Sequence, residues 1–171
     1  MTARIKTFTS IIRSLFVLLF FACTPENNGN NSLAGNQIEL PKWTWPLIQS
    51  TAFKEKYTFD LRINPFYLQA DFDKNGFGDI AILIKERTSG KTGVALLLQG
   101  KSQLKILGAG QVASFGGEDW NWLRTWKTET ILPAGAGVQP VGAVLILFPS
   151  DINQEAPWLY WNGQDWQWKN D

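Results

Sequence analysis

The chain contains no histidine, and Cys23 is the only cysteine among its 171 residues. Without histidine, it cannot form a Ser-His-Asp triad, a Cys-His pair or a His-ligated zinc site. With a single cysteine, it cannot form an internal disulfide. Any catalysis would depend on carboxylates, lysine, tyrosine or a hard metal ion, so these two absences weigh against an enzyme.

The N-terminus lacks an apolar run long enough to span a membrane, which takes about 20 residues. The run at residues 15–21 (LFVLLFF) follows Arg4, Lys6 and Arg13, with no acidic residue before it, and Cys23 comes after one further alanine. A basic start, a short apolar stretch and a small residue at the cut are the parts of a secretory signal. The alternative, an N-terminal membrane helix, conflicts with the proline and the Asn cluster that follow.

The residues before Cys23 resemble a bacterial lipobox. In Phe20-Phe21-Ala22-Cys23 a small residue precedes the cysteine, and Phe20 stands where the motif usually has Leu, Val or Ile. In such proteins, signal peptidase II cuts before the cysteine, which then carries lipid. The resemblance implies a lipoprotein held at the membrane of the cell envelope through Cys23. Thr24 replaces the aspartate typical of inner-membrane retention, which favours the outer membrane and leaves open the side that the protein faces.

Composition divides the chain into segments. Residues 1–22 are the predicted signal peptide, residues 23–38 the lipidated cysteine and an Asn-rich flexible tether, and residues 39–171 a single β-rich globular domain. Loss of the signal leaves 13 Lys and Arg against 15 Asp and Glu, a net charge of −2. No basic patch is visible, so nucleic acid is not an expected partner.

The pattern of apolar residues predicts a mainly β fold. Strands are expected at residues 66–70, 79–85, 94–99, 104–107, 141–148, 158–161 and 164–169. They would form an antiparallel sheet, as a β-sandwich or a propeller-like blade, with one or two short helical turns. Residues 40–49 fit a short helix or an irregular arm, and residues 118–127 fit a strand or a short helical turn.

The dipeptide Asn162-Gly163 predicts a two-residue hairpin turn, because both positions of a type I′ turn need positive φ. Such a turn would pair Trp161 with Gln164 and Leu159 with Trp166. The side chains that would then share the apolar face of the hairpin are Leu159, Trp161, Trp166 and Trp168.

A candidate metal loop lies at residues 71–79 (DFDKNGFGD), with oxygen-bearing side chains at positions 1, 3, 5 and 9 and Gly76 at position 6. Calcium takes six to eight oxygen ligands, and alternate acidic side chains around a tight turn supply them. An EF-hand is excluded, because Ile82 stands at position 12, where a glutamate is needed. The alternative is an Asx-rich turn without metal.

The loop and the strand after it (DIAIL) resemble the D-x-D-x-[DN]-G-x-x-D segment of FG-GAP and VCBS (integrin-type) repeats. The C-terminal half resembles small bacterial lipoproteins that carry one such loop, and the resemblance is good over residues 64–100 and loose elsewhere. A propeller of this family needs several such loops, whereas this chain has one. The resemblance implies a structural calcium ion, with side-chain ligands from Asp71, Asp73, Asn75 and Asp79 and a carbonyl ligand from Phe77.

The chain contains nine tryptophans. Large apolar side chains are most often buried, but tryptophans also form platforms for sugar rings and protein partners. An exposed row of Trp120, Trp122 and Trp126 would suit a carbohydrate-binding accessory lipoprotein, so core packing and a ligand platform are both open.

A carboxylate-based glycoside hydrolase is the remaining class. It needs two facing carboxylates across a cleft, and Glu118, Asp119 and Glu129 are the clustered candidates outside the metal loop. The sequence favours a non-catalytic binding or structural module of the cell envelope, with an envelope protein or a glycan as its partner.

Overall fold

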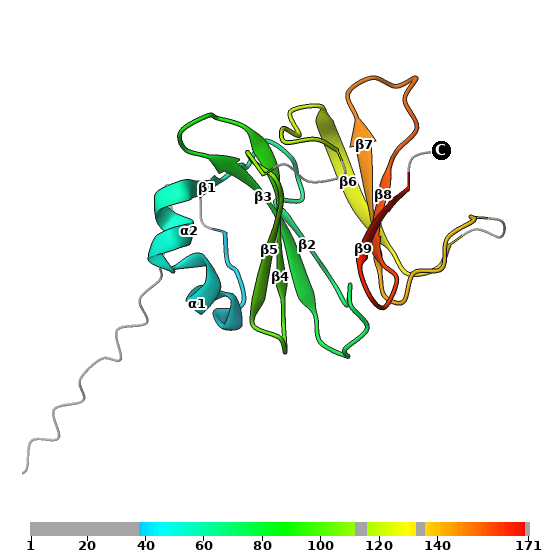
Figure 1. The fold of residues 1–171 in the computed structure, drawn as a ribbon, viewed down its shortest axis with the longest axis horizontal. Coiled ribbons are helices and arrows are strands. Elements are labelled where there is room, and N and C mark those ends of the chain that lie inside the picture. Colours follow the sequence, from blue (N-terminus) through cyan, green and yellow to red (C-terminus); the bar gives the residue numbers. More distant parts are fainter. Residues whose placement is uncertain (1–37, 112–115, 133–135, 170–171) are drawn as a thin grey trace, which may run out of the picture.

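A computed structural model describes residues 38–111, 116–132 and 136–169. The predicted signal peptide, Cys23 and nearly all of the tether lie outside these ranges. The described chain forms two antiparallel sheets that pack face to face, and short helices cover the outer face of the first sheet (Figure 1). The predicted mainly β fold with short helical turns is confirmed.

The helical segment follows from proline and a capping serine. The 3-10 helix η1 (Lys42–Thr44) leads into α1 (Trp45–Ile48), which has a proline in its first turn. Helix α2 (Thr51–Lys56) begins after Ser50, whose Oγ accepts a hydrogen bond from the Phe53 N–H at 3.3 Å. No helix within the described ranges is long and apolar enough to cross a membrane.

The first sheet contains β1 (Tyr57–Phe59), β2 (Tyr67–Ala70), β3 (Asp79–Glu86), β4 (Thr92–Leu98) and β5 (Gln103–Gly108). Its order is β1-β3-β4-β5, and β2 pairs with the first half of β3, on the same side as β1. Residues 80–84 of β3 are all apolar, as expected of a strand with both faces buried. Ile80 and Ile82 contact the helical layer, whereas Ala81 faces the second sheet.

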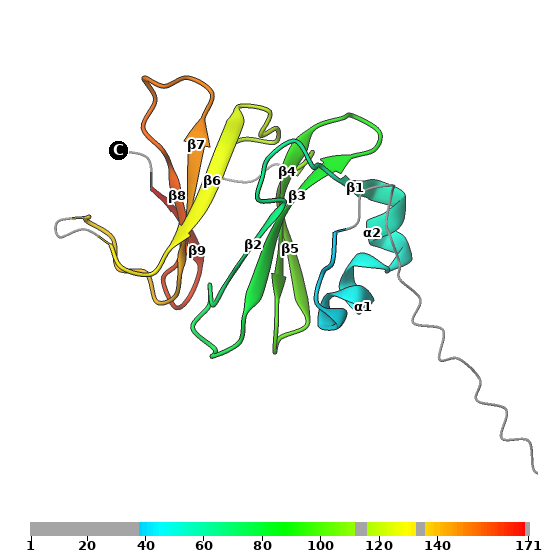
Figure 2. The same ribbon diagram turned by 180° about the vertical axis from the view of Figure 1, so that it is seen from behind.

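The second sheet contains β6 (Leu123–Glu129), β7 (Val144–Pro149), β8 (Trp158–Trp161) and β9 (Trp166–Lys169), in that order. Strand β7 begins three residues later than predicted, at Val144. Contacts with distant parts of the chain explain this difference. The Val141 and Ala143 N–H groups donate to the carbonyls of Trp161 and Asp71. Figure 2 shows the two sheets and the helical layer from behind.

The predicted register of the C-terminal hairpin is wrong by two residues. Trp161 pairs with Trp166, so the connection is a four-residue loop, and Asn162 Oδ1 accepts hydrogen bonds from the Gln164 and Asp165 N–H groups. A shift of two residues keeps every side chain on its predicted face, because the side-chain period of a strand is two. The predicted apolar face is therefore correct, and Trp166 is buried in the core on that face.

Of the two alternatives for the tryptophans, the exposed row of Trp120, Trp122 and Trp126 is wrong, and core packing is correct for Trp120 and Trp126. Trp120 is 0% exposed and Trp126 3%, and both belong to the core between the two sheets, with the partly buried Trp122 packed against them. Trp120 precedes β6 rather than lying within it, so the three side chains do not form a flat row on one strand. Burial of large apolar area between two sheets outweighs surface display here.

Candidate metal centre

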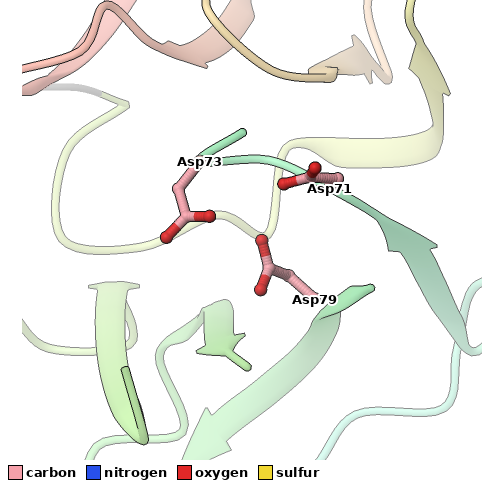
Figure 3. A group of neighbouring side chains, drawn as sticks. All are labelled: Asp71, Asp73 and Asp79. Carbon is pink, nitrogen blue, oxygen red and sulfur yellow. The ribbon is translucent and has the colours of Figure 1, made fainter. Parts of the chain in front are cut away.

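The loop between β2 and β3 brings three acidic side chains together. One carboxylate oxygen from each of Asp71, Asp73 and Asp79 lies within 4.8 Å of the others. Figure 3 shows the three carboxylates turned toward a common space. Asp79 is 0% and Asp73 7% exposed, and Asp71 is half-buried. The predicted carboxylate ligands therefore converge, at the end of the sandwich where the β4–β5 and β8–β9 turns also lie (Figure 1).

Asp71 shapes the tight turn. Its Oδ1 accepts a hydrogen bond from the Asn75 N–H at 3.0 Å, and its Oδ2 accepts one from the Gly76 N–H at 2.9 Å. Gly76 has φ +86°, a conformation that glycine adopts without steric cost. Position 6 of the loop needs glycine for this reason, as the sequence pattern predicts.

Asp79 joins the loop to the core. Its Oδ2 accepts a hydrogen bond from the Phe72 N–H at 3.0 Å, and its Oδ1 accepts one from the Gln99 N–H at 2.8 Å. The Phe72 side chain is 0% exposed and packs between the sheets. Phe72, which precedes Asp73, is thus fixed by its buried side chain. Asp79, at the end of the loop, is fixed by Gln99, which follows β4.

Asp73 is the unusual member of the cluster. Its side chain is 1% exposed, and neither of its oxygens accepts a hydrogen bond within the described residues. Lys101 Nζ lies 2.9 Å from Oδ2 as an ion pair outside hydrogen-bond geometry. A buried carboxylate without hydrogen bonds is costly. Three convergent carboxylates with an unsatisfied buried member fit a hard cation with oxygen ligands.

Asn75 and Phe77 have different surroundings. The Asn75 Nδ2 donates to the Gln99 carbonyl at 2.7 Å, and its Oδ1 accepts from the Phe77 N–H at 2.8 Å. Asn75 therefore ties the loop to the end of β4, and its role as a metal ligand stays a prediction. The Phe77 side chain is 51% exposed, and ligation by the Phe77 carbonyl likewise stays a prediction.

The second sheet also supports the loop, and sequence reasoning missed this contact. The Ala143 N–H donates to the Asp71 carbonyl at 2.8 Å. A Cβ atom on Gly142 would lie 2.3 Å from the Phe72 carbonyl oxygen, so only glycine allows this approach. Gly142 lies 71 positions after Asp71, and no local pattern links the two. The loop thus bridges both sheets.

Burial raises the pKa of Asp79 from its ordinary value of 3.8 to about 6, although the N–H groups of Gln99 and Phe72 act in the opposite direction. Repulsion by the neighbouring Asp73 and Asp71 carboxylates makes a smaller contribution to the same increase in pKa. The cluster therefore disfavours its own full ionisation, as expected of like charges in a partly buried site. A bound cation would reverse that preference.

This raised pKa predicts an unusual pH dependence for the metal-free protein. The folded state holds the Asp79 proton with a pKa of about 6, whereas the unfolded chain releases it near 3.8. The associated stability is therefore present below pH 3.8 and is lost as the pH rises through 6. In chelator, we expect the unfolding midpoint Tm to rise as the pH falls from about 7.5 to about 5.

Tryptophan fluorescence during heating measures this Tm. The Asp165→Asn variant lacks one exposed carboxylate, and its Tm should change with pH as that of the wild type does. Asp119 contributes to the pH dependence of stability at a lower pH than Asp79 does. Burial tends to raise the pKa of Asp119, but hydrogen bonds from Thr92 and Asn121 outweigh it and hold the pKa below 3.8. A metal-free Tm that stays flat or falls between pH 7.5 and 5 would contradict the raised pKa of Asp79.

The carboxylates considered for a hydrolase each have a local partner. Asp119 accepts hydrogen bonds from the Thr92 N–H at 2.9 Å and the Asn121 side chain at 2.9 Å. Glu118 pairs with Lys91, and Glu129 with Lys127. A general acid needs a raised pKa, and that of Asp119 is lowered. These contacts favour structural roles.

No known protein family, no curated protein and no solved structure matches this chain.

Proposed function

We propose that the protein is a lipid-anchored, non-catalytic module of the cell envelope, whose β-sandwich is stabilised by one calcium ion at Asp71, Asp73 and Asp79. The calcium site is supported above all by the Asp73 side chain, which is 1% exposed within a cluster of three carboxylates. Among the described residues, Asp73 has an ion pair with Lys101 but no hydrogen bond to either oxygen. The N-terminal signal and Cys23 support the lipid anchor.

Calcium at this position would stabilise both sheets. The loop is joined to β4 through Gln99 and Asn75 and to the segment before β7 through Ala143. An ion that neutralises the carboxylates would remove their mutual repulsion and fix these contacts together. The site has three formal negative charges, and extracellular sites of this kind bind calcium at about 10⁻⁴ to 10⁻³ M, which suits a structural role.

Heating in chelator and then in calcium tests this role. We expect millimolar calcium to raise the Tm of the mature chain, residues 23–171 in mild detergent at pH 7.5. At ten times the Kd, linkage stabilises the folded state by about 1.4 kcal/mol. Magnesium at the same concentration should have a smaller effect, because it demands tighter octahedral geometry. An identical Tm in chelator and in saturating calcium would contradict the proposal.

The anchor is tested separately with Cys23→Ser. In a bacterial host, we expect the wild-type chain in the membrane fraction. Its mass should correspond to a chain that begins at Cys23 and carries lipid. The Cys23→Ser chain should lack this added mass, and its signal should not be removed by signal peptidase II. Mass spectrometry of the purified chains measures both. An unlipidated wild-type Cys23 would contradict the anchor without affecting the calcium site.

A further inference from the structure

A cavity of about 400 Å³ opens beside the acidic loop, at the same end of the sandwich. The first sheet lines it through the β4–β5 turn and the start of β5, and the second sheet lines it through the β8–β9 hairpin. Asp73 also borders it, so the cavity adjoins the candidate metal centre. This size lies within the range of small-molecule sites, about 300 to 1,000 Å³.

Trp161 supplies an aromatic wall. The side chain is half-buried, and its ring packs against the buried Trp166 with centroids 5.6 Å apart. The Lys101 ammonium lies 5.3 Å from the centroid of the Trp161 ring. A flexible lysine, rather than the packed core, therefore covers this part of the indole.

The polar groups around the cavity have both signs. Lys101 and Lys105 are cationic, Asp73 and Asp165 are anionic, and Gln103 adds a neutral donor and acceptor. The formal charges cancel, which favours a neutral ligand over a phosphate or another anion. An aromatic face with hydrogen-bonding groups beside it matches a sugar ring, which has an apolar C–H face and a rim of hydroxyl groups.

Lys101 belongs to the cavity and to the metal centre at once. Its Nζ lies 2.9 Å from Asp73 Oδ2 and 5.3 Å from the Trp161 ring centroid. A divalent cation on Asp73 would compete with the ammonium for the same carboxylate and repel it. Loss of this ion pair leaves the lysine, whose side chain is 42% exposed, free to turn toward solvent and away from the indole.

We propose that this cavity binds a neutral sugar ring of a glycan against Trp161, and that calcium favours binding by releasing Lys101 from Asp73. The calcium dependence rests on the metal site proposed above, whereas the sugar site rests on the cavity alone. This site differs from the tryptophan row considered from the sequence, because Trp120 and Trp126 are buried in the core.

The test uses the mature chain on a panel of immobilised neutral oligosaccharides: glucans, mannans, galactans and N-acetylglucosamine oligomers. Binding is measured in chelator and in about 10 mM calcium, which exceeds the Kd of typical extracellular sites. Four chains are compared: wild type, Trp161→Ala, Trp158→Ala and Lys101→Ser. Trp158 is the matched control, because it lies on the same strand and points to the opposite face.

We expect the wild type to bind at least one sugar class in calcium, with at least tenfold weaker binding for Trp161→Ala and an unchanged affinity for Trp158→Ala. Lys101→Ser should bind equally well with and without calcium, because its indole is uncovered in both conditions. It should also bind calcium up to about fivefold more tightly, having lost the competing ammonium. Lys101→Ser keeps Trp161, so it tests the cavity even if Trp161→Ala does not fold.

Two results would overturn the sugar site: no sugar binding by calcium-loaded wild type or by Lys101→Ser, or binding by a folded Trp161→Ala chain that equals the wild type. Equal wild-type binding with and without calcium would overturn the role of Lys101. If calcium itself fails to bind, sugar binding by Lys101→Ser still supports the cavity. Failure of the metal site and failure of the sugar site are therefore distinguishable.

Discussion

Replacement of Trp120 by alanine is expected to lower the free energy of unfolding by about 3 to 5 kcal/mol, the range for truncating a buried aromatic side chain. Trp120 is 0% exposed, and its ring centroid lies 5.8 Å from that of Trp122 and 5.7 Å from that of Trp168. Its Nε1 donates to the Gly117 carbonyl at 3.3 Å. The variant would leave a large cavity between the sheets.

Urea unfolding followed by far-UV circular dichroism measures this loss. Trp161→Ala is the matched control, because Trp161 is only half-buried and its loss should cost much less. A cost below about 1 kcal/mol for Trp120→Ala would show that this side chain is not part of the core. Equal losses for the two variants would contradict the different burial of their side chains.

Replacement of Asp73 by asparagine is expected to stabilise the folded protein in chelator and to destabilise it in saturating calcium. In chelator, the variant should be more stable than the wild type by on the order of 1 kcal/mol, because one of three mutually repelling carboxylates loses its charge. Loss of the Lys101 ion pair opposes this by less than about 1 kcal/mol, since the lysine is 42% exposed. A neutral amide also avoids the cost of burying a carboxylate that accepts no hydrogen bond from the described residues, which adds to the gain. In saturating calcium, the wild type should become the more stable chain.

Thermal unfolding of both chains at pH 7.5 measures the crossover, with Asp165→Asn as the charge-matched control. Asp73 is the informative position because its oxygens accept no hydrogen bond from the part of the chain that the structure describes, so an amide of the same shape disturbs no backbone contact there. Asp79→Asn would be a poorer test, since both Asp79 oxygens accept backbone hydrogen bonds. A variant that is less stable in chelator, or that keeps the full calcium shift, would contradict the account.

The strands could be predicted because their signals are local. The run DIAILIK in β3 is apolar at every position but the first and last, and it is buried on both faces as such a run predicts. The convergence of the three carboxylates could be predicted as well, because Asp71, Asp73 and Asp79 are close in sequence and Gly76 marks the turn. Spacing within nine consecutive residues therefore accounts for the convergence of these three side chains.

The errors arise where distant segments decide the outcome. The C-terminal hairpin is an exception, because its error is local: Asn162 Oδ1 accepts hydrogen bonds from the Gln164 and Asp165 N–H groups, and the loop has four residues instead of two. Periodicity places Trp120 and Trp126 on one face without showing that a second sheet covers it. Lys101 and Gly142 reach the loop only through tertiary contacts, so no sequence pattern indicates them.

Calorimetric titration of the mature chain with calcium at pH 7.5 measures binding at Asp71, Asp73 and Asp79 itself. We expect one ion per chain, a Kd of about 10⁻⁴ to 10⁻³ M, and no binding by Asp73→Asn. Repetition at pH 5 should show weaker binding, because the proton on Asp79 competes with the ion. No heat of binding by the folded wild type up to about 10 mM calcium, ten times the weak end of that range, would contradict the metal site.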